Sequence, residues 1–377
     1  MDTSFQEYGF SIWGSTSPKT ACLAEDWRHR IERMVVSLKS LRPTLVCLVL
    51  MLAGCGGAAL STSVPPSAGD SAQRPKATLA WPAAVGSVAP VWATKEGGYF
   101  EQNGVDIGLQ YINGSPKAVA ALIGGTAQFV DSPGPAVVSA DAAGAHVVMV
   151  MAWVDRPAFL FMTTQDIARP EQLKGKTIGV TNVGGSDDFL ARKTLEHFGL
   201  KPDADVHIAA VSGEGKVAAL QRGLIQGFAE NPPNDVLAAK AGAHVLFRTS
   251  ELGIPYLGSG LATTREYARD HPNVVASVVK AVTQGIHRFK TDRVFAQQVL
   301  AQYLKNDDRE VLDSAYDAYA GIFPQVPAPT LAAMQASASE AAASGELKGN
   351  IDVTTMMDAS FVDKLQQSGF IRQLYGE

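Results

Sequence analysis

The sequence predicts an α/β protein of two lobes, and three observations lead to that prediction. Strand-like and helix-like segments alternate from residue 78 onward, which is typical of parallel sheets with right-handed crossovers. Residues 146–153 form an apolar run, as expected for a strand that helices cover on both faces. The chain of 377 residues is 46% hydrophobic and 18% charged, a globular composition that is long enough for two domains.

The first α/β set occupies residues 78–153. Ser87 can cap its first helix, and Pro116 suits the start of the second, where the missing N–H costs little. The expected strands are 78–81, 105–109, 128–130 and 146–153, and the expected helices are 88–99, 117–123 and 136–143.

The second set is organised around residues 173–188. Residues 177–180 form a short apolar strand, after which two glycines lead to a helix start at Ser186. The Ser186 hydroxyl is expected to cap this helix, while Asp187 and Asp188 lie against the positive end of its dipole. The other expected strands are 159–163, 206–209, 227–229 and 245–247, and the expected helices are 187–198, 216–222 and 234–241.

The last third of the chain is predicted to be helical. An extended segment at 256–263 can carry the chain back to the first lobe, and helical periodicity begins at residue 272. Val275, Val279 and Val282 share one apolar stripe, which we interpret as core. Further helices are expected at 295–304, 311–323, 330–343 and 360–367.

Small hydroxyl side chains recur where the predicted strands present their carboxyl edge, which is where ligands bind in open α/β sheets. A single serine there commonly serves only as a cap. Four of them together can line one cleft, in which backbone N–H groups hold a polar head. The candidate ligand-binding residues are Ser87, Ser115, Ser132, Pro133, Asn182, Gly185, Ser186, Asp187 and Glu230.

No convincing catalytic motif is present in the sequence. Residues 213–217 only superficially resemble a phosphate-binding loop, because Ala210 and Val217 replace the glycine and the hydroxyl residue that the motif requires. Ser259 is not a nucleophile elbow, because leucines stand where that motif needs glycines. The seven histidines lack metal-ligand spacing. We therefore expect no enzymatic activity, no cofactor and no metal site.

Charge argues against nucleic acid as a partner. The net charge is −5, the pI is near 5.8, and no basic run with interleaved aromatic residues occurs.

Residues 1–54 are predicted to be a leader that ends in a secretory signal peptide. Lys39 and Arg42 precede an apolar run at 45–52 that is too short for an ordinary membrane-spanning helix. The run ends in Leu-Ala-Gly-Cys, which resembles the bacterial lipobox and implies that Cys55 carries lipid and anchors the protein in the periplasm. Translation starts at Met1 or Met34, and residues 55–76 are expected to be a flexible tether.

Four segments carry a family resemblance: 97–107 (GGYFEQNGVDI), 120–125 (AALIGG), 174–186 (KGKTIGVTNVGGS) and 219–223 (ALQRG). Together they resemble the substrate-binding proteins of aliphatic sulfonate, taurine and nitrate ABC importers, a superfamily shared with thiamine-pyrimidine synthases. The resemblance implies a two-lobed periplasmic-binding-protein fold of type II (Venus-flytrap). Its crossovers would be 158–164 and 256–264. Lobe I would be 77–163 plus 257–377, and lobe II 164–256.

The same resemblance implies a monomeric extracytoplasmic protein that captures a small organic solute and delivers it to the permease subunits of an ABC importer. A sulfonate-like solute is the first choice. The turns at 130–132 (VDS) and 230–232 (ENP) depart from sulfonate binders. No Lys or Arg occupies the predicted ligand turns and Glu230 lies close by, so a heterocycle such as a pyrimidine vitamin precursor is the rival. An enzyme of the thiamine-pyrimidine synthase type is disfavoured, because the mature chain keeps no internal cysteine.

Overall fold

The structure, a computed structural model, describes residues 74–212, 215–345, 347 and 351–376. The expected leader, the lipidation at Cys55 and all but the last residues of the tether lie outside this part of the chain and stay predictions. None of the helices between residues 74 and 376 that the structure describes has both the length and the hydropathy that crossing a membrane requires.

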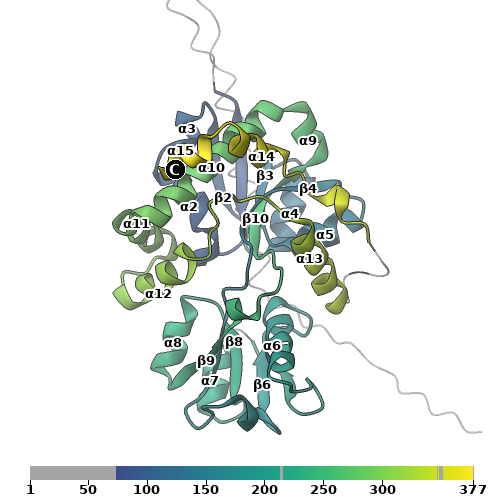
Figure 1. The fold of residues 1–377 in the computed structure, drawn as a ribbon, viewed down its shortest axis with the longest axis vertical. Coiled ribbons are helices and arrows are strands. Elements are labelled where there is room, and N and C mark those ends of the chain that lie inside the picture. The colour runs from purple at the N-terminus through teal and green to yellow at the C-terminus, as the bar shows by residue number, and fades with distance from the viewer. Residues whose placement is uncertain (1–73, 213–214, 346, 348–350, 377) are drawn as a thin grey trace, which may run out of the picture. The chain divides into compact units, whose positions relative to one another are not determined.

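The first sheet has the strand order β2-β1-β3-β10-β4. Its strands β2, β3, β4 and β10 are labelled in Figure 1. Its strands are β1 (Lys76–Trp81), β2 (Asp106–Tyr111), β3 (Phe129–Ser132), β4 (Val147–Val154) and β10 (Ser259–Thr264). β1 pairs in parallel with β2 and β3, whereas β10 is antiparallel to both β3 and β4. The helical elements before β4 are η1 (Gly86–Val88), α2 (Ala89–Glu96), α3 (Tyr99–Gln102), α4 (Ser115–Ile123) and α5 (Gly134–Ala142).

The second sheet repeats this plan with the order β7-β6-β8-β5-β9. Its strands are β5 (Leu160–Thr164), β6 (Thr177–Val180), β7 (His207–Ala210), β8 (Gly227–Glu230) and β9 (Ala243–Arg248). Its helical elements are η2 (Pro170–Leu173), α6 (Ser186–His197), α7 (Lys216–Gln221), α8 (Asn234–Lys240) and η4 (Thr249–Leu252). The two-lobed α/β fold is therefore confirmed.

The sheets are mixed, which corrects the expectation of parallel sheets. In each sheet the strand that arrives from the other lobe, β5 or β10, enters antiparallel between two strands of the local set. The expected crossover at 158–164 contains β5, which pairs with β8 and β9 in the second sheet. The chain therefore leaves the first sheet between Val154 and Leu160, and we propose that the first lobe boundary lies there instead of at residue 163.

The expected helix over 88–99 is divided into α2 and α3. Gly97 follows α2, and Gly98 takes a left-handed φ of 67°, a conformation that glycine adopts at little cost. The pair of glycines therefore turns the chain between the two helices.

The C-terminal helices cover the first sheet, and those predicted from periodicity are confirmed. The apolar stripe of α10 (Pro272–Thr291) packs against α2, where Gly285 lies close to Thr94. α13 (Leu331–Ala343) packs against α5. The remaining elements are α9 (Arg265–Asp270), α11 (Arg293–Leu304), α12 (Arg309–Ala320), η5 (Thr354–Met356), α14 (Ser360–Gln367) and α15 (Phe370–Tyr375).

Candidate functional site

A groove of about 510 Å³ lies where α4, α5 and α13 of the first lobe meet the turn that precedes α6 of the second. Most of its walls are alanine, proline and other apolar side chains. The lining residues are Ser115, Pro116, Val119, Ala120, Ile123, Pro133, Pro135, Ala136, Ser139, Ala140, Gly184, Gly185, Ser186, Glu340, Ala341 and Ser344. Because both lobes contribute, this groove is the candidate site.

The groove brings together four of the nine residues that the sequence singled out: Ser115, Pro133, Gly185 and Ser186. The other five lie outside its lining: Ser87, Ser132, Asn182, Asp187 and Glu230. Whether any of the nine contacts a ligand stays a prediction.

Ser87 and Ser132 belong to the first lobe but not to the lining of the groove. Ser132, at the end of β3, is fully buried, and its hydroxyl donates to the Pro133 carbonyl at 3.1 Å. Ser87 hydrogen-bonds the buried Tyr319 hydroxyl, and its carbonyl accepts from Trp153 Nε1 at 2.9 Å. Of the four serines that were expected to converge, Ser115 and Ser186 line this groove.

Ser186 does not cap α6, which corrects the sequence prediction. It is the first residue of the helix; Gly185 occupies the N-cap position and no side chain caps it. The Ser186 hydroxyl instead donates to Glu340 Oε1 on α13 at 2.5 Å. This hydrogen bond connects the two lobes at the edge of the groove.

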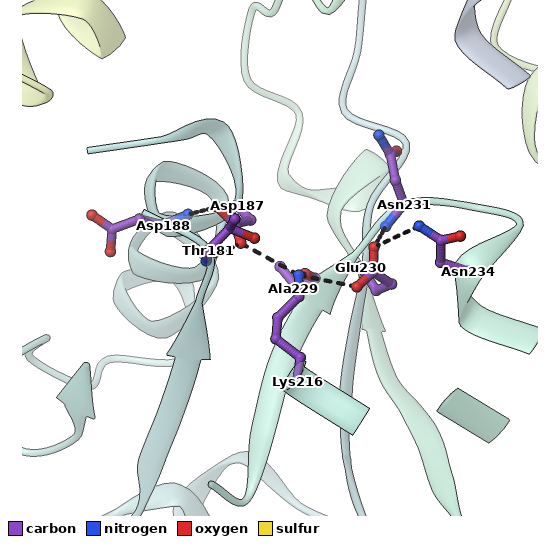
Figure 2. Close-up of polar contacts among 8 residues, drawn as sticks. All are labelled: Thr181, Asp187, Asp188, Lys216, Ala229, Glu230, Asn231 and Asn234. Carbon is purple, nitrogen blue, oxygen red and sulfur yellow. Dashed lines mark hydrogen bonds and ion pairs between the residues drawn. The ribbon is translucent and has the colours of Figure 1, made fainter. Parts of the chain in front are cut away.

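The carboxylates of Asp187 and Asp188 bind the amides of their own turn. Figure 2 shows the contacts of Asp187. Asp187 accepts from the Thr181 N–H at 2.6 Å and from the Asp188 N–H at 3.1 Å. Asp188 accepts from the Gly184 N–H at 2.7 Å. The turn presents backbone N–H donors, as expected, and the protein's own carboxylates take three of them, those of Thr181, Gly184 and Asp188.

Lys216, at the start of α7, lies between Asp187 and Glu230, as Figure 2 shows. Its Nζ is 3.0 Å from Glu230 Oε2, 3.4 Å from Asp187 Oδ2 and 3.1 Å from the Ala229 carbonyl. The sequence places no lysine or arginine within these turns, but Lys216 reaches two of their carboxylates from α7. The lysine is only 3% exposed, so it is a built-in counter-ion for the two carboxylates.

The second lobe also contacts the first at the start of α12. Lys240 on α8 pairs with Asp308 at 2.9 Å and with Glu310 at 3.1 Å. A third contact joins the lobes, in which the Tyr319 hydroxyl donates to Asn231 Oδ1 at 3.1 Å. The lobes thus meet at several points, which is the arrangement expected when two lobes close on a shared site.

Asp131 is a buried carboxyl next to the groove-lining Pro133. Its Oδ1 accepts from the Ser259 hydroxyl at 2.5 Å, while Oδ2 has no hydrogen-bond partner among the described residues. Burial raises the pKa of Asp131 to about 7, although hydrogen bonds from Ser259 and the Gly260 backbone oppose the shift. The folded protein therefore holds a proton that the unfolded chain releases between about pH 4 and 7.

Stability is expected to fall as pH rises through that window, because the folded pKa of Asp131 lies above its unfolded value. Asp131→Asn removes this fall, since the amide stays neutral at every pH. Urea unfolding of both proteins at several pH values between 4 and 8 measures the difference. The exposed Asp270→Asn is the control and should keep the wild-type trend; identical pH profiles for Asp131→Asn and wild type would contradict the assignment.

No three His, Cys, Asp or Glu side chains come together as a metal site requires, within the residues that the structure describes. Ionic side chains near the groove include Glu340 and the Lys216 cluster, which consists of Lys216, Asp187 and Glu230.

Comparison with known families gives one broad match. A family model described as "NMT1/THI5 like" matches residues 86–292, which is more than half of the chain.

Solved structures share the fold. The periplasmic sulfonate-binding protein SsuA of Methylobacillus flagellatus superposes with a TM-score of 0.65 at 17% identity, covering 79% of this chain and 96% of that one. The alkanesulfonate-binding protein SsuA of Xanthomonas axonopodis pv. citri, bound to MOPS, gives 0.58 at 22% identity, covering 76% and 99%. At these identities the likeness establishes the periplasmic-binding-protein fold.

A curated relative matches over a shorter span. The bicarbonate transport ATP-binding protein CmpC of Synechocystis is 28% identical over 109 residues. This match spans 29% of the chain and only 16% of the relative.

Proposed function

The chain belongs to the NMT1/THI5-like family, and on that premise we propose that it is the solute-binding component of an ABC importer. It holds a small organic solute between its two lobes and presents the loaded form to the permease subunits. Similar folds with sulfonate-binding and alkanesulfonate-binding names support this assignment, as does the family match.

One observation carries the proposal: the groove is lined from both lobes. Its volume of about 510 Å³ falls within the range of small-molecule sites, roughly 300–1,000 Å³. Closure of two lobes on such a site traps a solute without chemistry, and reopening releases it.

An enzymatic role receives no support from the groove lining. Its hydroxyl residues are Ser115, Ser139, Ser186 and Ser344, and the lining residues that the structure describes include no histidine, lysine or cysteine that could activate a nucleophile. Among the described lining residues, Glu340 has the one ionisable side chain. The lining therefore suits binding better than catalysis.

The cellular setting follows from the same proposal. The protein works outside the cytoplasm as a periplasmic monomer, and lipid on Cys55 anchors it to the envelope membrane. The proposed binding in the groove does not depend on the lipid anchor or on the monomeric state. A sulfonate-like solute is the first choice by resemblance, and a nitrogen heterocycle is the alternative.

A thermal-shift screen of the full chain tests the proposal. The panel contains alkyl and aryl sulfonates, nitrate, bicarbonate, pyrimidines and organic amines. A compound present at 100 times its Kd is expected to stabilise the folded protein by about 2.7 kcal/mol, since it binds only that state. A panel without any stabiliser would overturn the binding role, and turnover of a panel compound by the purified protein would indicate an enzyme.

A further inference from the structure

We propose that the protein has a second binding site, for a small divalent oxyanion of the phosphate type, at the junction between its lobes. The anion is held between Arg156 and Arg248. This inference goes beyond the proposed function and does not depend on it, because the second site and the groove share no lining residue.

The site is a hollow of about 250 Å³, which we call the hinge pocket, where the segments that connect the lobes meet α12. Residues 155–159 form the first segment, and η4 begins the second. The two segments are joined where the Phe159 carbonyl accepts from the Thr249 N–H at 3.0 Å and from its hydroxyl at 2.7 Å. The volume is below the roughly 300–1,000 Å³ of ordinary small-molecule sites, so the hinge pocket suits a small ion.

Arg248 contributes a guanidinium without a partner to the hinge pocket. It is the last residue of β9, and the pairing of β9 with β5 places it opposite Leu160. Its side chain makes no hydrogen bond or ion pair with the residues between 74 and 376 that the structure describes. The Ser250 hydroxyl, also in the lining, has no hydrogen-bond partner among those residues either. Both groups can therefore donate to a ligand.

Arg156 contributes a second guanidinium, whose contacts within the protein are long. Its Nη2 is 3.4 Å from the Gly321 carbonyl at the end of α12, and its Nε is 3.7 Å from Asp155 Oδ1. A strong charge-assisted hydrogen bond measures about 2.7–2.9 Å. Arg156 therefore keeps donors for an oxyanion, which the planar guanidinium fork suits.

The acidic group of the hinge pocket already has a partner. Asp317, the one carboxylate among the described lining residues, accepts from Arg293 through both oxygens, at 2.7 and 3.3 Å. Burial lowers the pKa of Lys290, and the charge of Arg156 adds to this shift although Asp155 opposes it. Positive charge therefore gathers here in a chain whose net charge is −5.

The rest of the lining is largely apolar and includes the buried Ala158, Leu160 and Ile322. Apolar walls of low dielectric strengthen the potential of the charges in a hollow. Two guanidinium groups in such a hollow are best neutralised by an anion with two charges. An anion that contacts both Arg156 and Arg248 also ties together the two segments that connect the lobes.

Isothermal titration of the full chain with inorganic phosphate tests the inference, in a buffer of low salt because salt screens exposed charges. Saturable binding is expected. Arg248→Gln should weaken it at least about tenfold, the typical effect of losing one charge-assisted hydrogen bond, and Arg156→Gln should do the same. Both arginines are exposed, so the unfolding midpoints of the two variants without phosphate should stay at the wild-type value.

Two control variants should keep the wild-type affinity for phosphate. Arg222→Gln removes an exposed arginine that follows α7 and lies outside the hinge pocket. Ala120→Phe fills the groove from an exposed position on α4.

The inference would be overturned by a wild type that binds no phosphate, or by unchanged affinity in Arg248→Gln. An equal loss in Arg222→Gln would overturn it too, since the attraction would then be general. A loss in Ala120→Phe would place the phosphate in the groove instead. The proposed function is tested separately, because it fails only if the thermal-shift panel yields no stabiliser.

Discussion

Replacing Lys216 with methionine is expected to lower the free energy of unfolding by about 3–5 kcal/mol, the usual cost of removing one partner from a buried ion pair. Methionine matches the length of the lysine stem, so little packing is lost. The loss is electrostatic, because Asp187 and Glu230 would face each other in a buried site without a cation.

Urea denaturation of Lys216→Met and of a matched surface variant measures this effect. Lys193→Met removes an exposed pair with Glu196 on α6 and should change stability by about 0.5 kcal/mol or less. The double variant Lys216→Met with Glu230→Gln should recover part of the loss, because one unpaired charge is gone. Equal free energies of unfolding for Lys216→Met and Lys193→Met would show that the ion pairs of Lys216 do not stabilise the folded protein.

The Lys216 cluster also shows why the sequence prediction of the site was incomplete. Periodicity located α6, α7 and β8 individually, because each has its own apolar pattern. The pairing of Lys216 with Asp187 joins residues 29 positions apart. It therefore depends on the tertiary arrangement of α6 and α7, which local patterns do not predict. Lysine is rarely buried, so the sequence gives no reason to place its ammonium inside the protein.

Glu340 was missed for a different reason. It lies in the alanine-rich helix α13, for which the sequence predicted a helix and no binding role, and its contact with Ser186 spans 154 residues. One sequence signal was available: a carboxylate on the buried face of a helix requires a partner. The fold class, by contrast, was predictable because alternation of strands and helices is a local pattern.

Capping was the weakest inference from local sequence. Ser186, Asp187 and Asp188 match a typical helix start, and the helix does begin there. Three acceptors compete for a few amides, and the two carboxylates take them, which leaves the hydroxyl to donate to Glu340. Local sequence therefore predicted the helix boundary correctly and the hydrogen-bond partners wrongly.

Replacing Gly184 with alanine is expected to weaken solute binding by about 10- to 100-fold, which corresponds to about 1.4–2.7 kcal/mol of affinity. Gly184 lies in the turn before α6, at a left-handed φ of 83°. A Cβ added there would be 2.3 Å from Ser344 Cα, at the end of α13 in the other lobe. The backbone at Ser344 cannot move aside as a flexible side chain can. The added methyl group therefore raises the free energy of the closed arrangement, in which Gly184 and Ser344 are in contact.

Gly199→Ala separates this effect from backbone strain. Gly199 follows α6 in the same lobe, has a φ of 73°, and has nothing within 4 Å of the added Cβ. Both variants therefore carry the strain of a left-handed alanine, about 1–2 kcal/mol, and should unfold at similar midpoints. Calorimetric titration with the compound that best stabilises the wild type should show weakened binding in Gly184→Ala alone. If both variants bind equally well, the contact between Gly184 and Ser344 is not part of the closed, solute-holding state.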